Sequence, residues 1–262
     1  MYALLFTEPG EHTSEYFQRV SMLRLIGGDV QRGTKPARFG NMDASRNPYN
    51  LFYDFHQAQF VCTWNGVTCE NEFVREIRWL RYGDPRVELR ILDLEWLPPT
   101  VASTCIRDQL ISARRFSTRY LPRASVYVDL TKCTLIGELV FRTAPEALAR
   151  LIVPNNYLSG IVDFTCLPDT LIDLNALENN FTRVIVDNKA IPKSLSSAQI
   201  GSHKNPRINI SVMEVSGQRV DNRIYVQLYG NDGNFMRLQW LWKEGKTLNK
   251  SIPEEKVIDD TN

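Results

Sequence analysis

Residues 148–184, LARLIVPNNYLSGIVDFTCLPDTLIDLNALENNFTRV, contain the same arrangement of residue types twice. Four apolar residues and an asparagine occur at Leu148, Leu151, Val153, Asn156 and Leu158. Equivalent types return 23 residues later at Leu171, Leu174, Ala176, Asn179 and Phe181. A fixed spacing of this kind indicates a repeated structural unit rather than one Leu-rich core segment.

The arrangement continues on both sides of this stretch. Two earlier copies are Ser125, Val128, Leu130, Cys133 and Leu135, and, 24 residues before them, Val101, Thr104, Ile106, Gln109 and Ile111. A degenerate copy follows at Leu195, Ala198 and Ile200, and another precedes at Val74, Ile77 and Trp79. The pattern resembles L-x-x-L-x-L-x-x-N/C-x-L, which recurs about every 20 to 29 residues in leucine-rich repeats.

The spacing predicts how each repeat folds. Apolar residues that alternate with polar ones, as at Leu151 and Val153, point inward from a short strand. Asn156 and its equivalents can then bond to the backbone of adjacent coils, and Cys133 is a known substitute at that position. Because one repeat cannot bury its apolar face alone, we expect the coils to stack. The predicted fold is a right-handed, strand-rich repeat solenoid of five or six coils with a concave parallel sheet.

The opposite side of each coil carries short apolar runs, such as GELVF at Gly137 and GIVDF at Gly160. A P-x-x-L step follows, from Pro145 to Leu148, from Pro168 to Leu171 and from Pro192 to Leu195. Proline cannot donate a ladder hydrogen bond and therefore punctuates the return into the next strand. Extended convex segments, rather than long helices, are expected.

Two stretches carry a more specific resemblance. LSGI at Leu158–Ile161 resembles the convex side of plant-type leucine-rich repeats, and CTWNGVTC at Cys62–Cys69 resembles the N-terminal cap C-x-W-x-G-V-x-C of plant-type and protist members. The LP-x-TL linkers are similar to those of trypanosomatid and other protist repeat proteins. This resemblance covers residues 61–210. It implies a Cys62–Cys69 disulfide in secreted relatives and a cap helix at Glu15–Ile26, with Tyr16, Phe17, Val20, Leu23 and Ile26 on its apolar face.

The cysteines leave two states open. An odd total of 5, together with a start that lacks a signal peptide, favours reduced Cys62 and Cys69 thiols and an intracellular location. The disulfide, and secretion if a leader is missing from this chain, remain the alternative. Glycosylation triplets at Asn180, Asn209 and Asn249 would support secretion if they are used. No apolar run reaches the roughly 18 residues of a membrane span.

The sequence divides into three expected parts: a flanking region and cap at 1–73, the solenoid at 74–210, and a cap hairpin with an acidic tail at 211–262. NRIYVQLYG and FMRLQWLW alternate on either side of NDGN, which is a hairpin signal. The polar loop Gln31–Asn50 is either a solvated connection or a docking tail.

Function is expected to lie on a surface rather than in a catalytic centre. The sequence holds 3 His and no catalytic, cofactor-binding or metal-binding spacing, and Asp163 and Asp187 are interpreted as polar positions on a solvated convex strand. A net charge of +1 argues against bulk attraction to nucleic acid, so binding through Arg78, Arg107, Lys132 and Arg150 is a minor alternative.

The outward positions of the concave strands are the candidate binding residues: Arg78, Arg107, Tyr127, Asp129, Lys132, Arg150, Ile152, Asn155, Asn175 and Leu177. The favoured hypothesis is a non-catalytic protein-protein interaction module or scaffold, a structural subunit of a multi-subunit complex, without cofactor or metal. A secreted or surface module that binds a peptide or glycan is the main alternative.

Overall fold

The structure is a computed structural model that describes residues 13–26, 60–80, 92–109, 111, 115–202, 211–216, 219–229 and 235–238. One α-helix, α1 (Thr13–Leu25), precedes strands and single 3₁₀ turns. The main-sheet strands are β1 (Val67–Glu70), β2 (Phe73–Leu80), β3 (Ser103–Arg107), β4 (Tyr127–Asp129), β6 (Arg150–Ile152), β8 (Asp173–Val186), β9 (Ser197–Ser202), β11 (Ile224–Tyr229) and β12 (Phe235–Leu238). The other strands are β5 (Ile136–Gly137), β7 (Tyr157–Asp163) and β10 (Ser211–Glu214), and the 3₁₀ turns are η4 (Val61–Thr63), η5 (Leu94–Trp96), η6 (Thr118–Tyr120), η7 (Phe141–Thr143) and η8 (Phe164–Cys166).

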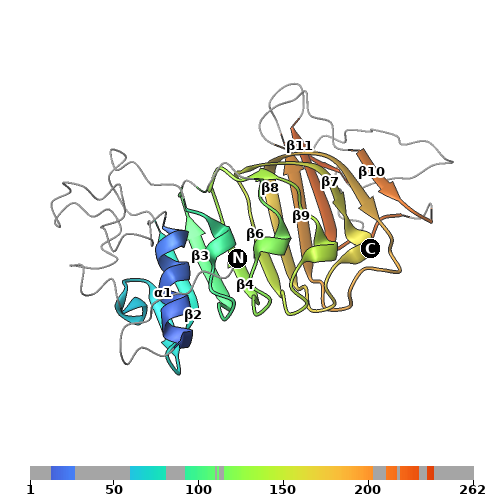
Figure 1. The fold of residues 1–262 in the computed structure, drawn as a ribbon. Coiled ribbons are helices and arrows are strands. Elements are labelled where there is room, and N and C mark those ends of the chain that lie inside the picture. Colours follow the sequence, from blue (N-terminus) through green and yellow to red (C-terminus); the bar gives the residue numbers. More distant parts are fainter. Residues whose placement is uncertain are drawn as a thin grey trace, which may run out of the picture.

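The main sheet receives one parallel strand from each coil, in the order β2-β3-β4-β6-β8-β9-β11 (Figure 1). Val128 of β4 lies opposite Leu151 of β6, which lies opposite Leu174 of β8. The register therefore reproduces the 23-residue spacing of the sequence. The predicted fold class is confirmed: the chain is a strand-rich, leucine-rich-repeat-like solenoid of about 5 turns.

The inward side chains of these strands form one continuous core. Leu151, Val153 and Ala176 are fully buried, as are their counterparts in neighbouring coils. Burying one such Leu or Val side chain contributes roughly 1.5–3 kcal/mol. Because the same two rows are buried in every coil, the inward and outward phase that the repeat pattern predicts is correct.

Asparagine side chains connect the coils just beyond the strands, as predicted. Asn156 Oδ1 accepts from the backbone N–H of Cys133 at 2.9 Å and of Leu135 at 3.0 Å. Its Nδ2 donates to the carbonyl of Leu130 at 2.9 Å. Cys133 takes the same place one coil earlier, where its Sγ lies 3.2 Å from the carbonyl oxygen of Ile106. These bonds satisfy backbone groups that would otherwise be buried without partners.

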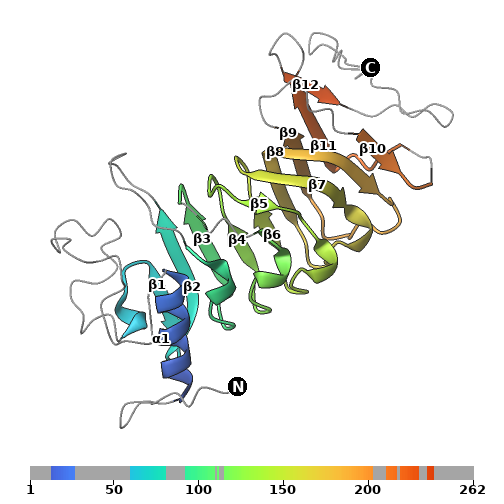
Figure 2. The same ribbon diagram turned by 45° about the horizontal axis from the view of Figure 1, so that its top comes forward.

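A second sheet covers the other side of the stack, as Figure 2 shows for β5 and β7. β7 pairs in parallel with β5 and with the second half of β8, and β10 extends the sheet on the far side of β8. β8 is 14 residues long because it belongs to both sheets. Extended convex segments, rather than long helices, are therefore confirmed for the described coils.

The return into β3, β4, β6 and β8 uses a 3₁₀ turn and a proline. The backbone N–H of Leu148 donates to the Pro145 carbonyl at 3.1 Å, and that of Leu171 to the Pro168 carbonyl at 3.0 Å. Asp163 Oδ1 accepts from the Thr165 N–H at 2.9 Å and so caps η8. Asp187 likewise accepts from the N–H of Lys189 at 2.9 Å. The interpretation of Asp163 and Asp187 as merely solvated strand positions is therefore incomplete, because each carboxylate caps a turn.

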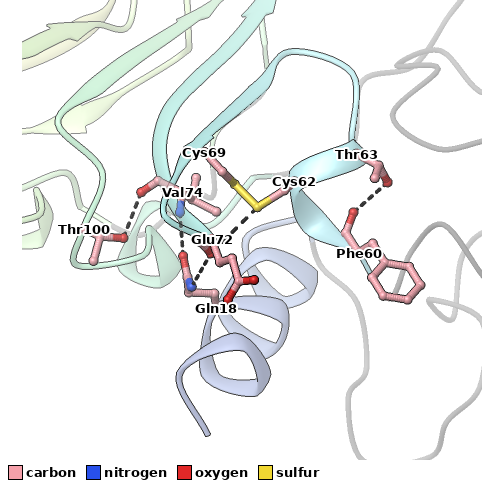
Figure 3. The surroundings of a disulfide bond; sticks show 8 residues. All are labelled: Gln18, Phe60, Cys62, Thr63, Cys69, Glu72, Val74 and Thr100. Carbon is pink, nitrogen blue, oxygen red and sulfur yellow. Dashed lines mark hydrogen bonds between the residues drawn. A yellow bond between two sulfur atoms is a disulfide. The ribbon is translucent and has the colours of Figure 1, made fainter. Parts of the chain in front are cut away.

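The N-terminal end of the stack is closed by α1, β1 and η4 (Figure 3). Gln18 of α1 is buried; its Oε1 accepts from the N–H of Val74 at 2.6 Å, and its Nε2 donates to the Glu72 carbonyl at 3.1 Å. Gly66 has φ +77°, and a Cβ there would lie 2.3 Å from the Arg78 carbonyl oxygen. The glycine of the CTWNGVTC stretch is thus required by a close backbone approach.

One expectation about this end is wrong, and a second is wrong at one residue, Phe17. Cys62 and Cys69 form a disulfide with Cα atoms 5.6 Å apart, instead of two free thiols, because η4 and β1 bring them face to face. Within α1, Phe17 is 51% exposed, whereas Met22 and Leu25 are fully buried. Tyr16, Val20 and Ile26 are buried as predicted, and Leu23 packs against the core. The buried face is wider than predicted, because the helix packs against both β2 and η5.

The C-terminal end carries the predicted hairpin, in which β11 pairs antiparallel with β12 and parallel with β9. Arg223 fastens this strand to the preceding coil: its Nη1 donates to the carbonyls of Pro192 and Leu195, both at 3.0 Å. Asp221 in turn holds the Arg223 guanidinium at 2.7 Å. The loop Gln31–Asn50, the triplets at Asn209 and Asn249, and the acidic tail lie outside the described residues.

Candidate functional site

The face of the main sheet that points away from the second sheet, which we call the concave face, carries two rows of outward side chains. The first row is Glu76, Ser103, Tyr127, Arg150, Asp173 and Ser197, and the second is Arg78, Cys105, Asp129, Ile152, Asn175 and Gln199. Adjacent members of a row come from neighbouring strands, which lie about 4.8 Å apart. Residues 23 or 24 positions apart in the sequence are therefore neighbours on this face.

Three residues of these rows, together with Leu177 further along β8, form what we call the central patch: Tyr127, Arg150, Ile152 and Leu177. Arg150 lies directly opposite Tyr127, and Ile152 follows Arg150 on the same face of β6. Leu177 stands beyond Asn175, which lies opposite Ile152. Arg150 is exposed and the other three are half-buried. The patch thus combines an aromatic ring, a cation and two aliphatic side chains.

Asp129 occupies the middle of the second row, and its environment differs from the sequence expectation. Its carboxylate is fully buried rather than exposed. One oxygen accepts from Arg107 Nε at 2.9 Å and from the Tyr127 hydroxyl at 3.3 Å. The other accepts from the N–H and the hydroxyl of Thr131, at 3.1 and 2.6 Å. Asp129 therefore positions Arg107 and Tyr127 and does not itself face a ligand.

The buried Asp129 carboxylate and its surroundings raise the pKa values of three neighbouring groups, Arg107, Tyr127 and Cys105. The hydrogen bond from Arg107 to Asp129 raises the pKa of the Arg107 guanidinium, which keeps it charged. Burial, with the negative charge of Asp129, raises the pKa of the Tyr127 hydroxyl. The same two causes raise the pKa of the Cys105 thiol, so this buried cysteine is a poor nucleophile. The centre of the face is a set of side chains fixed by hydrogen bonds to Asp129 rather than a reactive group.

Two further cations on this face are paired with carboxylates of adjacent coils. Arg150 Nε lies 3.2 Å from Asp173, and Lys132 Nζ lies 3.7 Å from Asp108. Together with the Arg107–Asp129 pair, these contacts neutralise three of the four basic residues considered for nucleic-acid binding. Phosphate contacts would have to compete with these carboxylates, which disfavours a polyanionic ligand.

The turns after β3, β4 and β6, and the equivalent position in β8, have a left-handed backbone conformation that sequence reasoning did not predict. Asp108, Lys132, Asn155 and Glu178 all have φ between +54° and +56°, one in each of four successive coils. Each stands immediately before the Asn or its substitute in the repeat pattern. This regular spacing is the signal that could have identified the left-handed turns. Asn155 and Lys132 therefore lie on the rim of the face, past the strand ends, whereas Arg78 lies on β2, two strands from Tyr127.

No group of three or more His, Cys, Asp or Glu residues that could hold a metal ion occurs within the part of the chain that the structure describes. Over the same part, no helix has the length and apolar character needed to cross a membrane.

Comparisons with known proteins give limited similarity. No family model matches the chain, and no curated protein matches it. Among solved structures, the crystal structure of a pollen receptor kinase 3 is similar, with a TM-score of 0.44 and 16% sequence identity; the match covers 70% of this chain and 86% of that chain.

Proposed function

We propose that the protein is a non-catalytic interaction module whose concave face binds another protein through the central patch. The observation that carries the proposal is that Tyr127 lies opposite Arg150, with Ile152 two residues further along β6 and Leu177 two residues beyond Asn175, the partner of Ile152 on β8. Tyr and Arg are enriched among the few residues that supply most of the binding energy in protein interfaces, often about 2 kcal/mol or more each. A rigid sheet holds them in place before binding, which lowers the entropic cost of association.

The surroundings of the patch support a protein as the ligand. Asp129 holds the side chains of Arg107 and Tyr127, so a cation and an aromatic ring at one end of the patch are already oriented. At the other end, Ile152 and Leu177 are half-buried and can receive an apolar side chain of a partner. Charges of both signs border the patch, as Arg150 and Asp173 do, and such mixed borders are typical of protein interfaces. Membership of a larger assembly is part of this proposal.

One observation favours the alternative that the module works outside the cytosol. The Cys62–Cys69 disulfide joins η4 to β1 in the N-terminal cap. Disulfides persist in oxidising compartments and are rare where glutathione and thioredoxin keep thiols reduced. We propose on this basis that the chain folds in the secretory pathway or another oxidising compartment. Its partner would then be a secreted or cell-surface protein, or a peptide or glycan.

The test compares proteins that co-purify with three forms of the full chain from native extract. The first form carries Arg150→Ala and Ile152→Ala in the central patch, and the second lacks Gln31–Asn50. The third is a matched control with Arg142→Ala and Ile161→Ala, which removes an exposed Arg and an exposed Ile from the opposite side of the stack.

If the proposal is correct, the patch variant loses a partner that the control variant retains. A circular dichroism spectrum and a melting curve like those of the unmodified chain must accompany this loss. If only the chain without Gln31–Asn50 loses partners, the concave-face proposal is wrong and the loop carries the interaction.

A further inference from the structure

Asn180 begins the triplet Asn180-Phe181-Thr182 in the part of β8 that belongs to the second sheet (Figure 1). The Phe181 side chain is fully buried, whereas Asn180 is half-buried and Thr182 is exposed. In a strand, alternate residues point to the same side. The acceptor amide and the hydroxyl of the triplet therefore share the outward face of the second sheet, while the residue between them anchors the strand in the core.

The neighbouring strand leaves space beside this amide. Ser159 of β7 lies directly opposite Asn180, and Gly160 lies opposite Phe181. The nearest outward neighbour on β7 is thus a serine, and the next position has no side chain. The Thr182 hydroxyl donates to the Gly160 carbonyl at 3.1 Å, which fixes the triplet in an extended conformation. A bulky group attached at Asn180 can extend away from the sheet without displacing a large side chain of β7.

We propose that Asn180 is an N-glycosylation site. The triplet and its outward geometry are the first observation, and the Cys62–Cys69 disulfide is a second, independent one, because the compartment that forms disulfides is also the one in which asparagine receives glycans. The inference rests on the proposed oxidising compartment and not on the concave face. The donor is a lipid-linked pyrophosphoryl oligosaccharide. The Asn180 amide nitrogen forms a bond to the anomeric carbon and loses a proton, the anomeric carbon–oxygen bond breaks, and the lipid pyrophosphate leaves.

A glycan at Asn180 would also account for exposed apolar side chains nearby. Tyr157 and Ile161 flank Ser159 on β7 and are 51% and 44% exposed. Exposed apolar groups of this kind mark either an interface or a surface that must be kept from association. A carbohydrate chain next to them is bulky and hydrophilic, so it shields this side of the stack. The second sheet is then closed to protein partners, and the concave face stays open.

The test is peptide mapping of the full chain purified from its native source. One portion is treated with an amidase that removes N-glycans and converts the modified asparagine to aspartate, and an untreated, non-reduced portion reports the state of Cys62 and Cys69. We expect a glycan on the peptide that contains Asn180 and, after treatment, the mass of an aspartate at that position. In chains expressed in the same organism, Asn180→Gln and Thr182→Ala abolish the modification, whereas Thr182→Ser keeps the required hydroxyl and retains it.

Each outcome decides something different. A glycan at Asn180 supports the site. An unmodified Asn180 in a sample whose Cys62–Cys69 bond is intact overturns the glycosylation site and leaves the compartment proposal standing. Free Cys62 and Cys69 thiols together with an unmodified Asn180 overturn both. None of these results depends on the central patch, which the partner experiment tests separately.

Discussion

Two buried threonines show how much one hydroxyl group matters in this core. Thr104 stands in the row that Val128 and Leu151 occupy in later coils, and its hydroxyl has no hydrogen-bond partner among the described residues. Thr118 is also fully buried, but its hydroxyl donates to the Val140 carbonyl at 2.6 Å. A buried threonine hydroxyl thus destabilises the fold at Thr104, where it has no partner, and links two coils at Thr118.

Replacing each threonine by valine should therefore have opposite effects. Thr104→Val removes an unsatisfied buried hydroxyl and should raise the free energy of unfolding by about 1 kcal/mol. Thr118→Val removes one of the hydrogen bonds to the Val140 carbonyl, which keeps the Thr143 N–H as a donor, and should lower the free energy of unfolding by about 1 kcal/mol. Urea denaturation of the two variants measures both values. Destabilisation by Thr104→Val would mean that its hydroxyl has a partner, such as a buried water.

The phase of the strands predicts a second contrast, between adjacent residues. Leu151 is fully buried, and a carboxylate there would lack a partner, so Leu151→Asp should cost several kcal/mol and prevent folding. Arg150 is 53% exposed and its pair with Asp173 is a surface one, so Arg150→Ala should leave the fold intact. Thermal melts of the two variants test this. Equal loss of stability in the two variants would mean that the assignment of inward and outward residues on this strand is wrong by one residue.

Among the elements, the asparagine ladder accounts for much of the order between coils. Asn179 Oδ1 accepts from the N–H of Leu158 at 3.0 Å, and its Nδ2 donates to the carbonyls of Val153 and Ala176 at 3.0 and 3.2 Å. Asn179→Ala should leave these buried groups unpaired and cost about 2–3 kcal/mol. Asn65→Ala, at an exposed position outside the left-handed backbone region, is the control for the loss of an amide. If denaturation gives the two variants the same stability, the ladder contributes little.

The elements also show which features the sequence could reveal. The strands, the ladder and the proline turns were predictable because each depends on residues within one repeat, such as Leu151, Asn156 and Pro168. The burial of Asp129 was not, because it results from the long Arg107 side chain of the adjacent strand reaching across to it. The buried face of α1 was predicted at Tyr16, Val20 and Ile26 but not at Met22 and Leu25. Those two were missed because the helix contacts two elements, β2 and η5, that lie far from it in sequence. The sequence alone did not decide whether Cys62 and Cys69 form a disulfide, because five cysteines are compatible with free thiols as well as with one bonded pair.

The last described coil gives a pH-dependent prediction. The hydrogen bond from Arg223 lowers the pKa of the Asp221 carboxyl in the folded protein. A lowered folded pKa stabilises the protein above the usual carboxyl pKa of about 3.9, and this stabilisation is lost as the pH falls through the lower folded pKa. Asp221→Asn should therefore cost about 1–2 kcal/mol at neutral pH and progressively less in acid.

Denaturation curves from neutral to acidic pH measure the difference in the free energy of unfolding between Asp221→Asn and the unmodified chain. Asp169→Asn is the control, because Asp169 is an exposed carboxylate. A difference for Asp221→Asn that stays constant down to strongly acidic pH would show that the Asp221–Arg223 ion pair does not contribute.

At the scale of the whole molecule, the solenoid is nearly one-dimensional. Each coil contacts only its neighbours, so its stability is set by its own packing and by the two interfaces beside it. The N-terminal coil has a single repeat neighbour, β3 next to β2, and its other side depends on α1, β1 and η4. Cap and stack are also linked where Arg24 of α1 lies 4.1 Å from the centre of the Trp96 ring. Loss of the cap should therefore lower the local stability of β2 most, and that of each further coil less.

The disulfide permits a direct test of this gradient. Cys62 and Cys69 are separated by 7 residues, and a loop of that length restricts the unfolded chain by about 2.5 kcal/mol in the chain-entropy estimate. We expect the double variant Cys62→Ser, Cys69→Ser to exchange the backbone amide protons of β1 and β2 faster, by a factor that falls towards β6 and β8. Hydrogen exchange read by mass spectrometry gives this profile. Cys166→Ser, which removes an unbonded cysteine near the middle of the stack, is the control. Because opening free energies in a repeat array depend on neighbour contacts, a uniform increase over all coils would mean that the chain unfolds as one cooperative unit.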